Sequence, residues 1–394
     1  MFDFIAFIVR FKYIILFYLG IIVLLWIKRK KLDIQAKVIV LYRMKWGLKW
    51  MDKYASKLRE WIILGGYVGV GAGYVGLIFI SYILIKNLID IIVNPATTPG
   101  VSVVLPGINV PGLGVLPFWY WIIAIFCIAI VHEFSHGIVA RAHQVEVKNT
   151  GIVFLGPILG AFVEPDEKKM QKQPDIVQYS ILAAGSFSNI LLAILSIILL
   201  LFVFTPVQQA MVEPTGFTFD SYQKGAYPMA EAGIKPGTLI TGVNGETVTH
   251  FQNFSQILSA AKPGDAITLA TAEREYSLIL AQSPDDPTKG FLGIKDIRNK
   301  FELKSIYQDS GWSVLYSSID WLAGFLRWLF LLSLGIGLFN LLPLPIVDGG
   351  RMAQVFLHKL KGDTLGERRY RQVGLFFLVL LVLNLALPWL MKLF

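Results

Sequence analysis

His132, Glu133 and His136 are the residues whose types and spacing most clearly point to chemistry. They form the pentapeptide HEFSH, near the end of the apolar stretch Trp119–Ala140. Residues four apart share one face of a helix, so both imidazoles can bind one metal ion while Glu133 acts as general base on a water molecule. Ionisable residues are costly within a membrane span and by default mark a functional site. The motif therefore predicts a hydrolytic centre with one Zn²⁺ per chain, inside the bilayer.

A third protein ligand is expected, because zinc in hydrolases usually binds three side chains and a water molecule. The extended pattern HExxHxxGxxH is not met, since Val139 and Ala142 stand where glycine and histidine would be. The better candidate is Asp348, in the phrase FNLLPLPIVDGGR at 339–351. The alternative for Asp348 is an ordinary helix cap. Four other residues are weaker candidates for the third ligand: His143, Glu164, His250 and His358.

The neighbours of Asp348 favour a carboxylate held in a fixed position. Pro343 and Pro345 interrupt the preceding helix. Gly349 and Gly350 permit a tight turn after the carboxylate. A carboxylate placed in this way next to apolar spans needs a cation as partner.

The composition indicates a membrane protein with several spans. The chain is 55% hydrophobic and 16% charged. About six stretches are long enough to cross a hydrocarbon core of roughly 30 Å: 5–27, 61–85, 117–140, 176–204, 313–339 and 372–391. The single cysteine, Cys127, excludes an intrachain disulfide and a thiolate metal cluster. The net charge of +9 does not indicate nucleic acid as a partner, because the basic residues flank apolar spans.

The distribution of Lys and Arg predicts the orientation in the membrane. Residues 28–60 contain eleven basic and three acidic residues, so this segment is expected in the cytoplasm. Alternation of the spans then places the basic loops that follow residues 141 and 358 on the same side. The predicted metal site is thereby near the cytoplasmic side of the cell membrane, and residues 205–312 are extracytoplasmic.

Residues 205–312 differ from the rest of the chain, because they are polar and rich in turns. Within the phrase AEAGIKPGTLITGVNGETVTHFQNFSQIL, we expect a strand at Leu239–Val243, a tight Asn244-Gly245 turn and a helix near Asn253–Ala261. The phrase resembles a PDZ domain, a class that binds an extended peptide as an added strand. The alternative is a generic α+β insertion without a ligand.

Residues 151–163 are apolar but too short to cross a membrane, and Gly156, Pro157 and Gly160 interrupt them. We expect a re-entrant hairpin, which is tolerated at membrane depth only where protein buries it or where it lines a cavity. The string GVGAGYVG at 69–76 contains a GxGxxG pattern but lies in an apolar span. Close helix packing explains it better than nucleotide binding.

Together, HEFSH in a span, NLLPLPIVDGGR after a later span and the PDZ-like insertion resemble the site-2 protease family of intramembrane metalloproteases. The phrase AAGSFSN at 183–189 is similar to that family's Gly-x-x-x-Asn phrase, although Ser186 stands where proline is frequent. The resemblance implies zinc ligands at His132, His136 and Asp348, with Glu133 as catalytic acid and base.

The resemblance also assigns roles to two asparagines and to the hairpin. Asn189 would face the active site and stabilise an oxyanion, and Asn340 would hold the substrate backbone. The hairpin at 151–163 would offer an edge strand to the substrate. The alternative for each asparagine is a hydrogen bond to a neighbouring helix.

The predicted fold is an α-helical polytopic membrane protein with about six transmembrane helices and a small α+β PDZ-like extramembrane domain. Six segments are expected: an N-terminal span with a basic cytoplasmic segment (1–60), a second span with an outer loop (61–116), catalytic core spans with HEFSH and the re-entrant segment (117–204), the PDZ-like domain (205–312), a core span with the Asp ligand (313–351), and a cytoplasmic loop with a C-terminal span (352–394).

The predicted function is zinc-dependent intramembrane cleavage of a single-span membrane protein. The lipid bilayer and a peptide ligand of the PDZ-like domain are further expected partners. Two alternatives remain open: a metal-binding membrane transporter or sensor, and a PDZ-type membrane scaffold without hydrolysis. An intact Glu133 between the two histidines favours hydrolysis, because a transport site needs no general base.

Overall fold

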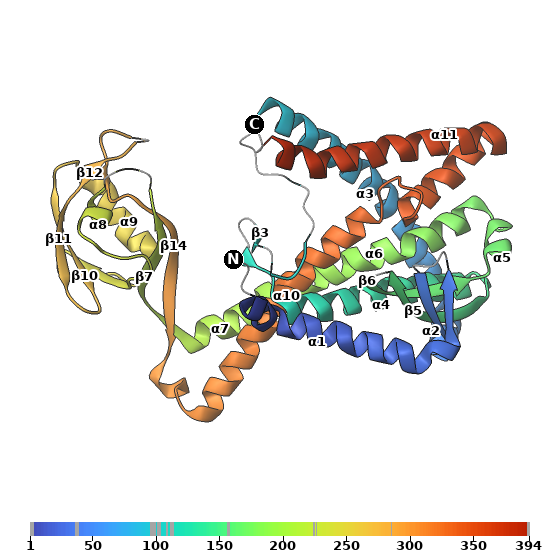
Figure 1. Cartoon of the computed structure of the whole chain (residues 1–394), viewed down its shortest axis with the longest axis horizontal. Helices are drawn as coiled ribbons and strands as arrows, with labels where there is room; N and C mark the ends of the chain where they lie inside the picture. Colours follow the sequence, from blue (N-terminus) through green and yellow to red (C-terminus); the bar gives the residue numbers. More distant parts are fainter. Residues whose placement is uncertain are drawn as a thin grey trace. The chain divides into compact units, whose positions relative to one another are not determined.

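The computed structural model describes residues 4–35, 39–94, 100, 104–107, 109–110, 114–155, 158–223, 225, 227–284 and 286–391. Six helices in this part of the chain are long and apolar enough to cross a membrane, which confirms the predicted fold class (Figure 1). They are α1 (Phe4–Lys28), α3 (Arg59–Val93), α4 (Phe118–Ala142), α6 (Asp175–Leu199), α10 (Ser310–Phe339) and α11 (Asp348–Leu390).

The chain divides into two compact units. One comprises Met1–Leu200 and Gly324–Phe394, and the other comprises Leu201–Ala323. In the first unit, α4 packs against α6, and α3 packs against α6 and α11. A buried core joins these helices through side chains such as Met51, Ile181, Leu341 and Met352.

Small residues on α3 allow this close packing. A Cβ added at Gly73 would lie 3.2 Å from Ala183 of α6, and one at Gly76 would lie 2.4 Å from Leu341. Gly71 faces open space instead. The GxGxxG string is therefore a helix-packing face, as the sequence predicts.

A four-stranded antiparallel sheet lies beside α4 in the first unit (Figure 1). Its order is β1 (Leu32–Gln35), β2 (Ile39–Met44), β5 (Val147–Leu155) and β6 (Ile158–Pro165). The expected hairpin at 151–163 is thus present as β5 and β6, although Gly156 and Pro157 lie outside the described residues. The addition of β1 and β2 from the basic segment was not expected.

Shorter elements connect these parts of the first unit. They are η1 (Arg29–Lys31), α2 (Leu48–Lys57), β3 (Asn109–Val110), β4 (Gly114–Val115) and α5 (Glu167–Gln171). The basic segment after residue 352, expected as a loop, is helical. It belongs to α11, whose two parts meet at Gly362 with φ of 73°.

The second unit is an α+β domain built on one sheet. Its strands lie in the order β11 (Glu275–Ile279), β10 (Ala266–Thr271), β8 (Ile240–Val243), β7 (Val212–Tyr222) and β14 (Ile294–Leu303), and β9 (Glu246–Thr247) pairs with β8. Asn244 and Gly245 have φ of 51° and 81°, as a tight hairpin between β8 and β9 requires. The expected strand and helix are present as β8 and α9, over a core that includes Phe217, Phe219 and Phe254. The π-helix η2 (Leu200–Phe204) lies at the start of this unit. The other elements of the unit are α7 (Thr205–Met211), α8 (Pro228–Glu231), α9 (Phe251–Ala260), β12 (Ala281–Gln282), β13 (Gly290–Phe291) and η3 (Ser305–Tyr307).

Candidate metal centre

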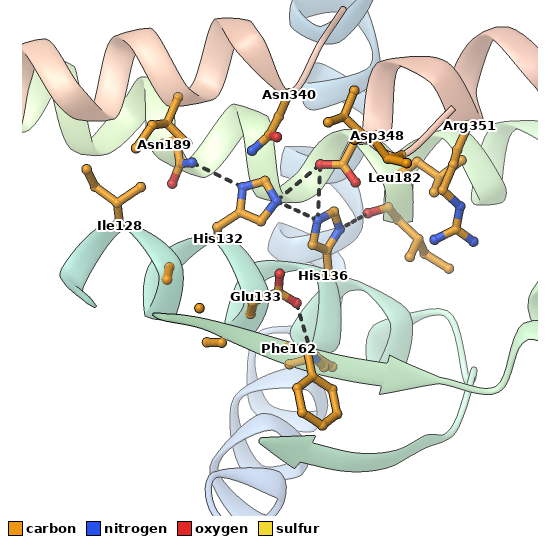
Figure 2. Close-up of a pocket in the computed structure, with 18 of the residues that line it drawn as sticks. Ile128, His132, Glu133, His136, Phe162, Leu182, Asn189, Asn340, Asp348 and Arg351 are labelled. Carbon is orange, nitrogen blue, oxygen red and sulfur yellow. Dashed lines mark hydrogen bonds and ion pairs between the residues drawn. The ribbon is translucent and has the colours of Figure 1, made fainter. Parts of the chain in front are cut away.

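The two histidines of HEFSH meet Asp348 at one point of the first unit (Figure 2). His132 Nε2 lies 3.2 Å from His136 Nε2. Asp348 Oδ2 lies 3.2 Å from His132 Nε2 and 3.3 Å from His136 Nε2. The two nitrogens and the oxygen are the ligand types that zinc binds in hydrolases. The structure thus brings Asp348 to a histidine pair that lies far from it in the sequence.

Asp348 reaches this point because the chain turns sharply between α10 and α11. The helix α10 ends at Phe339, and the carbonyl of Asn340 accepts a hydrogen bond of 2.7 Å from the Gly349 amide. A Cβ on Gly349 would lie 2.1 Å from the Leu341 carbonyl oxygen, and one on Gly350 would lie 1.7 Å from the Leu344 carbonyl oxygen. The two glycines are helical, so they allow the preceding backbone to approach closely and do not themselves form the turn.

The histidine pair also has the space and the hydrogen bonding that a metal ligand needs. A Cβ on Gly185 of α6 would lie 2.3 Å from His136 Nε2 and 2.6 Å from His132 Cε1. His136 Nδ1 lies 2.7 Å from the Ile181 carbonyl oxygen, to which it can donate. That bond fixes the tautomer in which Nε2 is free to coordinate a metal. The residues present therefore fit a zinc ion.

Asn189 contacts the other histidine of the pair, His132. Its buried side-chain amide lies 3.1 Å from His132 Nδ1, and its Oδ1 has no hydrogen-bond partner among the residues that the structure describes. Nδ2 is the atom nearest to the ring in this arrangement. A half-turn of the amide would place Oδ1 there, where it could accept a hydrogen bond from Nδ1–H and leave His132 Nε2 for the metal. Asn189 therefore orients a candidate ligand, a contact that sequence reasoning did not anticipate.

The Glu133 carboxylate lies between the histidine pair and β6 (Figure 2). Its Oε2 accepts a hydrogen bond of 2.9 Å from the Val163 amide. Because backbone groups alternate in direction along a strand, Val163 and Ala161 both direct their amide and carbonyl groups to the unpaired side of β6. The general base predicted from the sequence is thus fixed against the edge of the sheet.

A cavity of about 450 Å³ contains all the site residues predicted from the sequence. Figure 2 shows Asn340 on the opposite side of His132 from α4, with its side chain directed toward the histidine pair. The cavity is lined by residues of α4, β6, α6, α10, α11 and the turn before α11, among them Ile128, His132, Glu133, His136, Ala161, Val163, Asn189, Asn340, Asp348 and Arg351.

The alternative ligands lie elsewhere. His143 contacts Ser180 at 3.3 Å, and burial together with the nearby Arg59 charge lowers the pKa of its imidazole. Glu164 pairs with Arg43 at 3.2 Å. His250 contacts the Phe301 ring edge to face in the second unit, and His358 pairs with Glu367 at 3.3 Å. Each of these residues has a partner other than the cluster.

Sequence reasoning missed residues that shape the site without binding the metal. Gly185 leaves room for the histidine pair, and Ser186 Oγ donates to Asp348 Oδ2 at 3.4 Å. Gly185 and Asn189 are four residues apart, so they share one face of α6. The resemblance already placed Asn189 at the site, so this spacing is the signal that could have linked Gly185 to it as well.

Comparisons with known proteins identify a peptidase family. The model of a family described as Peptidase family M50 matches residues 120–384. An uncharacterized protein of Methanocaldococcus jannaschii is 25% identical over 344 residues, which cover 84% of this chain and 80% of that protein.

Two bacterial relatives carry functional names. Protease RseP of Yersinia pestis is 27% identical over 235 residues, which cover 45% of this chain and 51% of that protein. A putative zinc metalloprotease of Neisseria meningitidis serogroup A is 26% identical over 220 residues, covering 42% and 48%. The chain thus spans about half the length of these two relatives.

A solved PDZ domain from Listeria monocytogenes is 22% identical to this chain. The match covers 21% of this chain and 86% of that domain, with a TM-score of 0.19. This score does not establish a common fold, so the PDZ-like character of residues 205–312 stays a prediction.

Proposed function

This chain belongs to peptidase family M50, and we propose that it is a zinc-dependent endopeptidase that cleaves transmembrane segments of other proteins. The observation that carries the proposal is the convergence of His132, His136 and Asp348, with Glu133 beside them. All four residues lie on helices long and apolar enough to cross a membrane.

His132, His136 and Asp348 would hold a single zinc ion, which supplies Lewis-acid activation of water and of a peptide carbonyl. Ile181 and Asn189 would keep the two imidazoles oriented, as outer contacts of metal ligands usually do. The role of these five residues is to position the reacting groups and to exclude bulk water.

Glu133 would move the protons of the reaction. Its carboxylate would accept a proton from the attacking water and deliver it to the leaving amine. The hydrogen bond from Val163 supports this role, because it holds one carboxylate oxygen while the other stays available.

The substrate would bind as an extended strand along β6. A peptide bond within a helix is shielded, so the helix must unwind locally before cleavage, and strand addition compensates the lost backbone hydrogen bonds. The unpaired edge at Ala161 borders the cavity that contains the candidate ligands. Asn340 and Asn189 lie in the same cavity, which supports contacts with the substrate backbone and with a developing oxyanion.

The partners and the orientation follow from the remaining parts of the chain. The basic segments that flank the spans support an active site near the cytoplasmic side of the cell membrane. The domain at 205–312 would then be extracytoplasmic, where a PDZ-like fold could bind a peptide end of the substrate.

The test is Glu133→Gln in the full chain, reconstituted with a tagged single-span substrate. Cleavage is expected to fall below detection while the bound zinc stays at the wild-type level, because the amide cannot accept the proton. Glu146→Gln is the matched control, since this exposed glutamate forms its ion pair with Lys169, away from the candidate ligands. Undiminished cleavage by the Glu133→Gln protein would refute the mechanism.

A further inference from the structure

The strands β1 and β2 and the helix α2 precede the residues matched by the family model, yet they pack against the strand β5 and the helix α4 beside the candidate site. The strand β2 pairs with β5 over six residues, from Ile39 opposite Leu155 to Met44 opposite Thr150. Together with β1, it thereby extends the β5–β6 hairpin into a four-stranded sheet whose two edge strands are β1 and β6. The strand that contacts Glu133 therefore depends on an element outside the matched region.

Arg43 on β2 reaches across the sheet to β6. Its Nε lies 3.2 Å from Glu164 Oε2, and its other side contacts Asp33 of β1. Arg43 is opposite Gly151 in the pairing of β2 with β5, and Gly151 has no side chain to separate it from β6. Asn149 donates to the same Glu164 oxygen at 2.9 Å. The guanidinium thus links three of the four strands.

This network ends one residue from the amide that holds the predicted general base. Glu164 and Val163 are neighbours on β6, and their side chains point to opposite faces of the sheet. Glu164 is fixed by Arg43 on one face, while the Val163 amide donates to Glu133 at 2.9 Å. A shift of β6 would therefore move the hydrogen-bond donor of Glu133.

The turn and helix after β2 also contact the HEFSH helix directly. Met51 of α2 is fully buried, and a Cβ on Gly137 would lie 2.6 Å from its sulfur. Gly47 has φ of 83°, and a Cβ there would lie 2.3 Å from the ring of Phe134. Thr150 Oγ donates to the Trp46 carbonyl at 2.7 Å, which ties this turn to β5. Phe134 and Gly137 directly neighbour the motif's Glu133 and His136.

We propose that the strands β1 and β2 are positioning elements for catalysis, in which Arg43 of β2, through Glu164, fixes β6 so that the Val163 amide holds Glu133 in its reactive position. The part that concerns catalysis rests on the proposed function. Hydrogen bonds between charged groups are stronger than neutral ones, so one guanidinium can fix the sheet where pairing alone permits displacement. Asp33 orients that guanidinium, and the hydrogen bond from Arg43 holds the pKa of Asp33 below its ordinary value.

The test compares Arg43→Met with Lys53→Met in the full chain in lipid vesicles. Both substitutions remove one positive charge and keep an apolar stem, but Arg43 pairs with Glu164, whereas Lys53 is an exposed residue of α2. For Arg43→Met, kcat is expected to fall roughly tenfold, because small misplacements of reacting groups cost that much or more. The value of KM should change by less than about threefold, and zinc content should stay at the wild-type level. Lys53→Met should match the wild type in all three measurements.

Hydrogen exchange supplies a measurement that does not need activity. The amides of β6, Val163 included, should exchange faster in the Arg43→Met protein than in the Lys53→Met protein. Glu164→Gln should lower kcat in the same direction, and the double variant Arg43→Met with Glu164→Gln should be no worse than Arg43→Met alone.

Two kinetic results would overturn the proposal: an equal kcat for Arg43→Met and Lys53→Met, or additive losses of kcat in the double variant. A fall of both kcat and zinc content in the Arg43→Met protein would also overturn it, because that result indicates a role in folding only. If the wild-type protein cleaves no membrane substrate, the proposed protease function fails. The exchange rates of β6 then still decide whether Arg43 positions this strand.

Discussion

Gly185 and Asn189 contribute to the same histidine pair in different ways. Gly185 leaves space where any side chain would meet the His136 and His132 rings, and Asn189 contacts His132 one helical turn later. Ser333 Oγ donates to the Asn189 carbonyl at 2.8 Å, so this turn of α6 is itself held by α10. At the scale of single residues, the site consists of candidate ligands together with neighbours that contact them.

Asp348→Ala tests the third ligand. Substitution of a residue that only contacts a metal ligand typically lowers metal affinity by roughly 10–100-fold. Removal of a ligand itself is expected to lower the zinc affinity further. Metal analysis of the purified protein measures it. The control is Asp363→Ala, because that side chain is 96% exposed and lies outside the cluster. A wild-type zinc content in the Asp348→Ala protein would exclude this residue as a ligand.

At the scale of elements, β6 has two different edges. One edge pairs with β5, whereas the other borders the cavity and contributes the Val163 amide to Glu133. Edge strands that stay unpaired are usually protected, because they pair readily with other chains. An unpaired edge beside a metal centre is an arrangement suited to binding an extended peptide.

Substitution of Met51 tests how strongly the packing of α2 against α4 stabilises the protein. Met51→Ala is expected to lower the free energy of unfolding by about 2–5 kcal/mol, since the lost side chain leaves a cavity between α2 and Gly137. Met51→Leu preserves most of the volume and should cost less than about 1.5 kcal/mol. Denaturant unfolding followed by tryptophan fluorescence measures both, and equal values for the two variants would contradict the packing argument.

At the scale of the whole molecule, the chain combines six potential spans with an α+β unit. The basic residues between the spans predict that residues 28–60 are cytoplasmic and that residues 205–312 are outside. Loops rich in Lys and Arg are retained preferentially on the cytoplasmic side of the membrane. The predicted orientation therefore depends on the charges of all the loops together.

Cysteine labelling tests this orientation. In a Cys127→Ser background, Lys235→Cys and Lys53→Cys each place one thiol at an exposed position. A maleimide that cannot cross membranes should label the first protein on intact cells and the second only after permeabilisation. The reverse pattern would invert the predicted topology and place the candidate site near the other side.

The helices, the metal motif and the internal features of the second unit could be predicted from the amino-acid sequence. Long apolar runs, HEFSH and the Asn244-Gly245 turn are local patterns, and each follows from the chemistry of adjacent residues. Asp348 could be predicted as a ligand too, because a carboxylate between proline and glycine residues beside apolar spans requires a cation as partner.

The contacts between distant residues could be known only from the tertiary structure. The meeting of Asp348 with the histidine pair depends on the close approach of Gly349 and Gly350 to the preceding turn. The pairing of β2 with β5 joins segments that α3 and α4 separate along the chain, and no local pattern in residues 28–60 indicated it. Strand pairing and side-chain contacts are set by packing across the fold, so the sequence could identify the reactive residues but not the elements that position them.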